Sequence, residues 1–553
     1  MKIALCQLNP TVGDLPGNVA KISDFLARAK ALGADVALLS ELALTGSPPR
    51  DLLLKEAFLD DQDAALSELA AGIHGITAVV GMAARHTEDK RLLYNSAAVI
   101  ADGRIIAVGH KRLLPNYDIF DDRRYFTPGS ETLIFTVAGM KAAVTICEDA
   151  WNEAGFWSTN SRLTGQKTYE HNPIEDCARA GAQVILNLSA SPFQAGKCEL
   201  RRRMLSFAAA KYGLPLAFTN QVGGNDEFIF DGASLGVSGK GRITACCRSF
   251  EEDLVLFDTH SQEEVKVEQP SPPEEVFRAL VLGVRDYMEK CAFESAIVGL
   301  SGGIDSALVC VIAAEALGRR NVSGVIMPSM HTSESSLADA NALAASIGIS
   351  TVTVPITPVY DAFMESLHDL FKDEKPGIAE ENIQARARAT ILMAISNKFG
   401  GMVLATGNKS EVSVGYCTLY GDMAGGLDVL GDVPKTLVWE MSRWINTNGV
   451  VIPPVIIEKA PSAELAPGQT DQDTLPPYDV LDEIVRLYIE EERGAAEIIR
   501  MGYDREVVAS AVRMIDTSEY KRRQSAPVLK VTGRAFGFGR RMPIAQRYRE
   551  VVS

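Results

Sequence analysis

The sequence lacks the features that mark several large classes of protein. No run of about 18 apolar residues occurs, so we expect no membrane-spanning helix. The first apolar run is interrupted by Gln7 and Asn9 and is too short for a signal peptide. The nine cysteines include no Cys-x-x-Cys pair, which argues against a zinc site and a disulfide framework. We therefore expect a cytoplasmic protein with reduced thiols.

Positive charge is outnumbered, because 55 Lys and Arg against 71 Asp and Glu give a formal net charge of −16 at pH 7. A surface of that sign repels nucleic acid, so we expect no nucleic-acid partner and, without a membrane segment, no membrane partner. Two common nucleotide-binding motifs are missing as well. There is no Walker phosphate loop and no dinucleotide fingerprint of three spaced glycines. Any nucleotide is therefore bound by another kind of loop.

Residues 301–306, Ser-Gly-Gly-Ile-Asp-Ser, are the most informative stretch that is present. A short apolar run precedes them and a helix-forming segment, residues 307–317, follows. Gly302 and Gly303 allow a tight turn and close approach to a ligand. The hydroxyls and the amides at the helix start then form an anion site. The alternative is an ordinary Gly-Gly turn, which the surrounding serines and Asp305 make less attractive.

The length of 553 residues indicates two domains, possibly three. Residues 263–276 are rich in proline and polar residues and read as a linker, which gives domains at 1–262 and 277–553. Strands and helices alternate in both halves, so both are α/β domains. In the second half this alternation predicts a doubly wound parallel sheet with its ligand at the carboxyl ends of the strands.

Three residues in the first half follow predicted strands: Glu41, Lys111 and Cys147. A thiol attacks as a nucleophile when a carboxylate takes its proton, and an ammonium stabilises the resulting anion. Each residue also has an ordinary interpretation. Cys147 would be a buried thiol, Glu41 a helix cap and Lys111 a solvated charge. Spacing alone does not decide between them.

The strings around these residues resemble the three motifs of the nitrilase superfamily. They are Ser40-Glu-Leu-Ala-Leu-Thr-Gly46, Lys111-Arg-Leu-Leu-Pro-Asn-Tyr117 and Ile146-Cys-Glu-Asp-Ala-Trp-Asn152. The resemblance implies an α-β-β-α sandwich. It also implies an amidase triad with Cys147 as nucleophile, Glu41 as general base and Lys111 as stabiliser of the tetrahedral intermediate.

The same resemblance implies how an amide substrate is held. Tyr117, Ser191 and Lys197 would contact glutamine, the latter two from a loop similar to the family's substrate loop. The chain departs from the family pattern at one place. Asp122 stands where a second glutamate is expected, which affects that residue's assisting role and not the triad.

Chemistry-bearing residues of the second half also gather at strand ends. Thr406 and Glu411 follow a strand at residues 401–405, and Lys435 opens a later helix. Asp305 and Glu411 are two carboxylates that would share a Mg²⁺ with ATP phosphates, since Mg²⁺ favours one or two carboxylates plus phosphate oxygens. Taken singly, these acids would equally be surface or capping residues.

The stretch at 301–306 resembles the PP-loop of the ATP pyrophosphatases. Further motifs of the second half are Asn382–Arg388, Leu404–Leu419, Tyr420–Gly426, Pro461–Leu465 with Gln469–Asp471, and Ser525–Lys530. Together these strings resemble the NAD synthetases. With the nitrilase-like half in front, the chain is similar to the glutamine-dependent members of that family. The resemblance implies ATP binding by Gly299, Leu300, Ser301, Gly302, Gly303, Ile304, Asp305, Ser306 and Thr406. It implies deamido-NAD binding by Asn382, Glu411 and Lys530, a Mg²⁺ at Asp305 and Glu411, and a phosphate contact by Lys435.

The implied reaction amidates deamido-NAD to NAD with ATP and with ammonia from glutamine, so the expected partners are these small molecules. The family forms homo-oligomers, which we expect here too. Three rivals are another glutamine amidotransferase, a tRNA-modifying PP-loop enzyme and a non-catalytic nucleotide-binding module. The role of five arginines as interface or solvated charge stays open: Arg522, Arg523, Arg534, Arg540 and Arg541.

Overall fold

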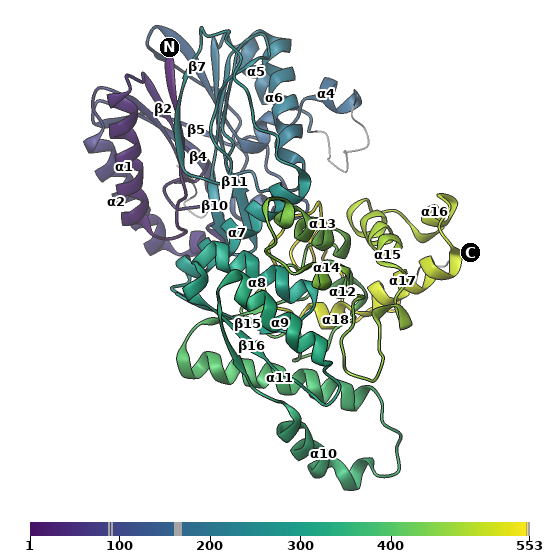
Figure 1. Cartoon of the computed structure of the whole chain (residues 1–553). Coiled ribbons are helices and arrows are strands. Elements are labelled where there is room, and N and C mark those ends of the chain that lie inside the picture. The colour runs from purple at the N-terminus through teal and green to yellow at the C-terminus, as the bar shows by residue number, and fades with distance from the viewer. Residues whose placement is uncertain (87–88, 90–91, 160–168, 549, 551–553) are drawn as a thin grey trace. The chain divides into compact units, whose positions relative to one another are not determined.

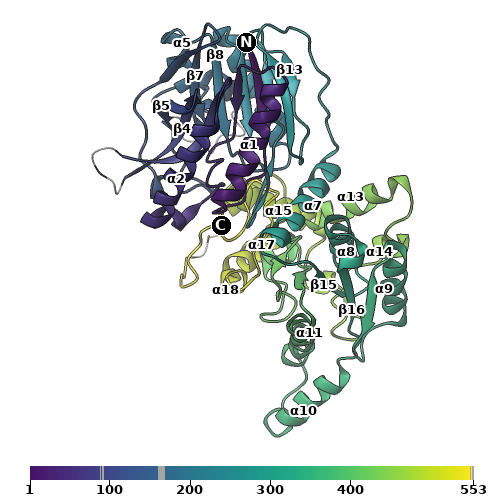
Figure 2. The same ribbon diagram turned by 90° about the vertical axis from the view of Figure 1, so that its left-hand side faces the viewer.

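The computed structural model describes residues 1–86, 89, 92–159, 169–548 and 550. Its chain divides into two compact units, Met1–Gln269 and Pro270–Ser553. Each unit has its own sheets and its own core (Figures 1 and 2).

The first unit contains two six-stranded sheets, ordered β14-β1-β2-β3-β4-β5 and β13-β12-β9-β8-β7-β6, and a separate hairpin, β10–β11. The strands β1 to β3 run parallel, as do β7 to β9, and the outer pairs are antiparallel. The strands are β1 (Lys2–Gln7), β2 (Val36–Leu38), β3 (Thr77–Arg85), β4 (Leu93–Ala101), β5 (Arg104–His110), β6 (Leu133–Val137), β7 (Met140–Ile146), β8 (Val184–Ser189), β9 (Leu216–Asn220), β10 (Val222–Asn225), β11 (Phe228–Asp231), β12 (Leu235–Val237), β13 (Ile243–Cys246) and β14 (Asp253–Asp258).

Three apolar clusters make this unit an α-β-β-α sandwich. One lies between the two sheets and includes Leu38 and Leu186. A second joins the first sheet to α1 and α2, and a third joins the other sheet to α5 and α6 (Figure 1). The helices are α1 (Leu15–Ala31), α2 (Glu56–Gly72), α3 (Asp122–Tyr125), α4 (Ala154–Thr159), α5 (Pro173–Arg179) and α6 (Lys197–Tyr212). The predicted layers of this half are thus confirmed.

The second unit is built on a five-stranded parallel sheet ordered β17-β16-β15-β18-β19. Helix α11 packs on one face through Ile391 and Leu392, and α8 packs on β15 and β16. The strands are β15 (Ala296–Leu300), β16 (Val322–Ile326), β17 (Ser350–Thr353), β18 (Met402–Ala405) and β19 (Leu427–Asp428). The strand order reverses between β15 and β18, which is where a doubly wound sheet binds its ligand.

Helices of the second unit cover the sheet and extend beyond it. They are α7 (Pro272–Lys290), α8 (Ile304–Leu317), α9 (Glu334–Ile347), α10 (Thr357–Phe371), α11 (Ile378–Phe399), α12 (Lys409–Val414), α13 (Lys435–Ile445), α14 (Pro454–Glu458), α15 (Tyr478–Val485), α16 (Ala495–Arg500), α17 (Arg505–Thr517) and α18 (Glu519–Arg522). Within the described residues, no helix combines the length and apolar character needed to cross a membrane.

The predicted linker at residues 263–276 is partly helical. Helix α7 begins at Pro272, inside the segment that the prolines suggested was irregular. Proline suits the first helical position because its missing N–H has no intrahelical acceptor there and its φ is already helical.

Candidate active sites

Glu41, Lys111 and Cys147 each stand just after a strand of the first unit, as the sequence predicts. Glu41 follows β2, Lys111 follows β5 and Cys147 follows β7. Their exposed fractions are 4%, 2% and 3%. Gly81 on β3 permits the close approach of the Glu41 segment, because a Cβ there would lie 2.3 Å from the Ser40 carbonyl oxygen.

The Lys111 ammonium lies between two carboxylates. Its Nζ donates to Glu41 Oε1 at 2.7 Å and to Asp122 Oδ2 at 2.7 Å. Burial alone would lower the pKa of Lys111, but Asp122 and Glu41 outweigh it and raise that pKa well above its usual value. Lys111 is therefore a fixed cation. Asp122, despite its shorter side chain, reaches the ammonium.

Cys147 begins a tight turn with a left-handed backbone, φ +43°. Burial raises the pKa of its thiol, and Glu41 raises it further while Lys111 opposes. A thiol in this setting stays protonated at rest and needs a neighbouring base to become a nucleophile. Glu41 is the carboxylate placed to act as that base.

Asp149 ties the turn at Cys147 to the segment that follows Lys111. Its carboxylate accepts hydrogen bonds from the amides of Ile146 (2.9 Å), Arg112 (3.0 Å) and Leu113 (2.8 Å). Two chain segments that are distant in sequence are thereby held in one arrangement.

One predicted glutamine contact, Tyr117, lies against a buried carboxylate that the sequence reasoning passed over. The Tyr117 hydroxyl lies 3.0 Å from both oxygens of Glu148, and the Tyr169 hydroxyl donates to it at 3.1 Å. Burial raises the pKa of Glu148 to about 6, while Lys111 and the tyrosine hydrogen bonds hold it down. Its place directly after Cys147 was the signal available in the sequence.

Ser191 lies on the loop between β8 and α6, and Lys197 is the first residue of α6. The Ser191 amide donates to Asn220 Oδ1 at 2.8 Å. Lys197 Nζ donates to the Pro192 carbonyl oxygen at 3.1 Å and stands 5.3 Å from the Trp151 ring centroid. Because Trp151 closes the turn that starts at Cys147, Lys197 lies close to the end of that turn.

In the second unit, the turn at residues 301–306 joins β15 to α8. Ser301 Oγ accepts from the Gly303 amide at 3.2 Å, and Ser306 Oγ donates to the Gly303 carbonyl oxygen at 3.0 Å. Gly302 has φ +80°, and a Cβ there would meet the Ser336 carbonyl oxygen at 2.4 Å. The turn therefore requires glycine at 302 for both conformation and space.

A cavity of 300 Å³ lies above this turn, at the carboxyl ends of the strands. Most of the predicted ATP residues line it, together with the predicted metal residues: Gly299, Leu300, Ser301, Gly303, Ile304, Asp305, Ser306, Thr406 and Glu411. Lys435, Arg388, Lys459 and Asp471 line it as well. The last three received no role in the sequence reasoning.

Asp305 and Glu411 converge on one cationic group, the Lys435 ammonium. Lys435 Nζ is 2.5 Å from Asp305 Oδ2 and 3.5 Å from Glu411 Oε1. Asn408 Nδ2 donates to the other oxygen of Asp305 at 3.0 Å. Burial raises the pKa of Glu411, Lys435 opposes this and Asp305 adds to it. Two carboxylates aimed at one point form a donor set that fits Mg²⁺ held jointly with phosphate.

Asn382 and Lys530 lie outside the residues that line this cavity. Asn382 Oδ1 accepts from Thr418 Oγ1 at 2.8 Å, and Thr418 is a lining residue. Lys530 is buried and its Nζ donates to the Thr532 carbonyl oxygen at 2.7 Å. The structure thus brings Asn382 to within one side chain of the cavity, while Lys530 is not among the residues that line it.

Two family models match the chain where these two sites lie. A carbon-nitrogen hydrolase model matches residues 2–157 and an NAD synthase model matches residues 276–525. A glutamine-dependent NAD(+) synthetase of Synechocystis sp. is 49% identical over 99% of this chain and 99% of its own length. The chain belongs to the glutamine-dependent NAD(+) synthetases.

Solved structures of this family agree with that membership. A glutamine-dependent NAD(+) synthetase from Acinetobacter baumannii, solved with ADP, is 40% identical over 98% of both chains, with a TM-score of 0.76. One from Cytophaga hutchinsonii is 22% identical over 99% of this chain and 98% of its own, with a TM-score of 0.83, and shares the fold. The predicted family and the predicted fold class are thereby confirmed.

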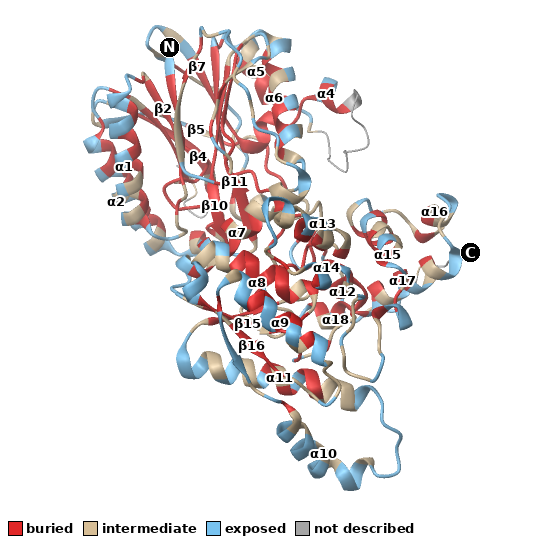
Figure 3. Cartoon of the chain, viewed as in Figure 1, coloured by how far each residue is buried: buried red, intermediate tan, exposed pale blue. Residues whose placement is uncertain are grey.

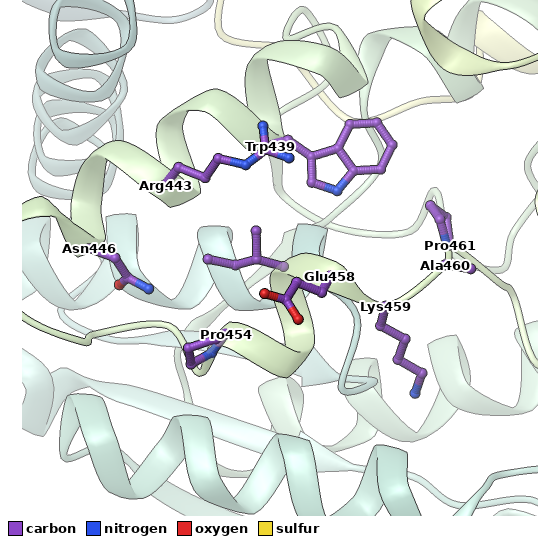
Figure 4. A pocket seen from close by; sticks show the side chains of 9 residues that line it. Trp439, Arg443, Asn446, Pro454, Glu458, Lys459, Ala460 and Pro461 are labelled. Carbon is purple, nitrogen blue, oxygen red and sulfur yellow. The ribbon is translucent and has the colours of Figure 1, made fainter.

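A second cavity, of 680 Å³, lies between α13 and α14 of the same unit. Figure 4 shows Trp439 and Arg443 on one side and Pro454 and Glu458 on the other. It shares residues 459–461 with the 300 Å³ cavity and includes none of the predicted site residues. The two cavities therefore adjoin at these three residues.

Proposed function

We propose that this chain amidates deamido-NAD to NAD, using ATP and the ammonia released from glutamine, with AMP, pyrophosphate and glutamate as products. One observation carries the proposal. A Cys–Glu–Lys site and a glycine-rich cavity with two convergent carboxylates occur in one chain that is 49% identical to a glutamine-dependent NAD(+) synthetase. An unactivated carboxylate does not accept ammonia, so the second site activates it with ATP, while the first site supplies the ammonia from glutamine.

In the first unit, Cys147 Sγ attacks the side-chain amide carbon of glutamine while Glu41 takes the thiol proton. Lys111 stabilises the oxyanion of the tetrahedral intermediate. The proton passes to the leaving nitrogen, ammonia departs and a glutamyl thioester remains. Water then attacks the thioester, releases glutamate and restores the thiol.

The ends of the glutamine molecule suggest partners for the surrounding residues. Lys197 offers a cation for the α-carboxylate, and Glu148 offers a carboxylate for the α-ammonium. Tyr117 and Tyr169 hold Glu148, which supports that role. Ser191 completes the set of glutamine contacts.

In the second unit, the nicotinate carboxylate of deamido-NAD attacks the α-phosphorus of ATP and pyrophosphate leaves. Ammonia then attacks the acyl carbon, and AMP leaves with the bond electrons. Residues 299–306 and Thr406 bind ATP, and Lys435 contacts its phosphates. Asp305 and Glu411 would hold a Mg²⁺, which neutralises charge on the phosphates when bound. Asn382, Glu411 and Lys530 bind deamido-NAD.

The test is NAD formation from deamido-NAD, ATP and Mg²⁺, run in parallel with glutamine and with ammonium. We expect activity with both nitrogen donors and one AMP for each NAD. Glutamine hydrolysis without NAD formation would overturn the acceptor and favour another carboxylate. ADP as the nucleotide product would overturn the adenylation step.

Replacing Asp122 by asparagine should lower kcat/KM for glutamine by about 10- to 100-fold, the usual value of a hydrogen bond to a charged group. Asparagine keeps the shape of the side chain but removes the negative charge of the carboxylate that accepts a hydrogen bond from Lys111. Hydrolysis of glutamine to glutamate is the measurement. Asp122→Glu, the side chain of the family pattern, should keep most activity. Equal losses in both variants would contradict a charge-based role.

We also propose that the chain forms homo-oligomers and is cytoplasmic.

Helix α10 is amphipathic, yet every residue in it is half-buried or exposed (Figure 3). Val359, Phe363 and Leu370 are 36%, 46% and 73% exposed. Phe363→Glu should shift the molecular mass measured by light scattering towards a smaller species, because a charge there opposes burial against a second copy. An unchanged mass would exclude this helix from the interface.

A further inference from the structure

Asn95 on β4 contacts two members of the Cys–Glu–Lys site. Its side-chain Nδ2 donates to Glu41 Oε1 at 2.7 Å, and its carbonyl oxygen accepts from the Lys111 amide at 2.8 Å. The residue is 2% exposed. The sequence analysis gave it no role.

We propose that Asn95 is a positioning residue that makes Oε2 of Glu41 the atom that takes the Cys147 proton. The inference rests on the proposed glutamine hydrolysis and specifies which atom of the base acts.

The hydrogen bonds to Glu41 support this choice of atom. An ionised carboxylate oxygen accepts about two hydrogen bonds. Oε1 accepts from Asn95 Nδ2 and from Lys111 Nζ, both at 2.7 Å, whereas Oε2 accepts from the Ala190 amide at 2.9 Å. Within the described part of the chain, Oε1 of Glu41 therefore already accepts two hydrogen bonds, whereas Oε2 accepts one and can accept one more. That remaining position is the one available to a thiol proton.

The amide of Asn95 is suited to this task and poorly suited to packing alone. It donates without carrying a charge, so it fixes the orientation of Glu41 without competing with Lys111. Its Oδ1 is buried and has no hydrogen-bond partner among the described residues. Burying an unpaired acceptor is unfavourable. A leucine or valine would pack in β4 without that cost, so the donor is the part of the side chain with a function.

Two variants separate a donor to Glu41 from mere space filling. Asn95→Leu removes the donor and should lower kcat/KM for glutamine hydrolysis by about 10- to 100-fold. Asn95→Asp keeps the shape and places a second carboxyl beside Glu41. At high pH the introduced carboxylate repels Glu41. At low pH its protonated form donates a hydrogen bond to Oε1 instead.

The expected signature is the pH profile. The activity of Asn95→Asp relative to the unmodified enzyme should rise by about fivefold or more as the pH falls from 8.5 to 6. A structural role would lower activity equally at all pH values. A flat ratio therefore overturns the proposal, even if Asn95→Leu fails to fold.

Asn187→Leu is the matched control. Asn187 is fully buried on β8, and its Nδ2 donates to Thr145 Oγ1 at 2.9 Å, not to Glu41. It should leave the pH profile unchanged. NAD synthesis with ammonium should be unaffected in every variant. If the unmodified enzyme fails to hydrolyse glutamine, the proposed function fails. If it hydrolyses glutamine and Asn95→Leu does so equally well, only this inference fails.

Discussion

Replacing Cys147 by alanine should lower the rate of glutamine-dependent NAD synthesis by at least about 10³-fold. The rate of ammonium-dependent synthesis should stay near its original value. The covalent route through a thioester exists only with a nucleophile at this position. Alanine removes one sulfur atom from a side chain that is 3% exposed, so the fold should persist. The measurement is initial rates of NAD formation with each nitrogen donor.

Cys177→Ala is the control for removal of a buried thiol. Cys177 is 1% exposed and packs in the cluster that joins α5 and α6 to the sheet. It should behave as the unmodified enzyme with both donors. Loss of ammonium-dependent activity in Cys147→Ala would contradict the division of labour between the two sites.

Replacing Lys435 by methionine should lower NAD synthesis by about 10²–10³-fold with both nitrogen donors, the usual loss for one preorganised charge at a reacting group. Its ammonium stands between Asp305 and Glu411, where the ATP phosphates are proposed to bind. Methionine keeps much of the length and apolar stem but removes the charge. Hydrolysis of glutamine by the first unit should continue, so glutamate release is measured beside NAD formation.

Lys290→Met is the control for removing a lysine ammonium from this unit. Lys290 pairs with Asp286 at 3.7 Å on α7, outside the residues that line the 300 Å³ cavity. It should retain activity with both donors. Full ammonium-dependent activity in Lys435→Met, with an unchanged melting temperature, would exclude Lys435 from phosphate binding.

Much of the fold followed from patterns that are local in the chain. Buried strands followed by polar residues placed Glu41, Lys111 and Cys147 correctly, since a strand's end and its next residue are read from a short window. The turn at residues 301–306 was equally local. The predicted strand at residues 401–405 corresponds to β18, one residue shorter. The two-residue strand β19 was missed because so short a run carries no periodic signal.

Side-chain partners distant in sequence were not predictable in this way. Arg522 and Arg540, left open between interface and solvent, are buried and pair with Glu519 and Asp516. Asn95 carries no pattern that separates it from other strand residues, and Glu148 is marked only by its place directly after Cys147. Lys530 was grouped with the deamido-NAD residues by resemblance, and the structure places it outside the cavity lining.

The sequence by itself therefore determined the α/β fold class and the family, and it predicted the residues that carry the chemistry. Those features depend on residue type and on spacing within single segments. The tertiary structure alone decided that Asp122 reaches Lys111, that Asp305 and Glu411 meet at Lys435, and that Asn95 fills Oε1 of Glu41. Each of these contacts joins segments at least 11 residues apart in the chain. Only the tertiary packing fixes the distances between such segments.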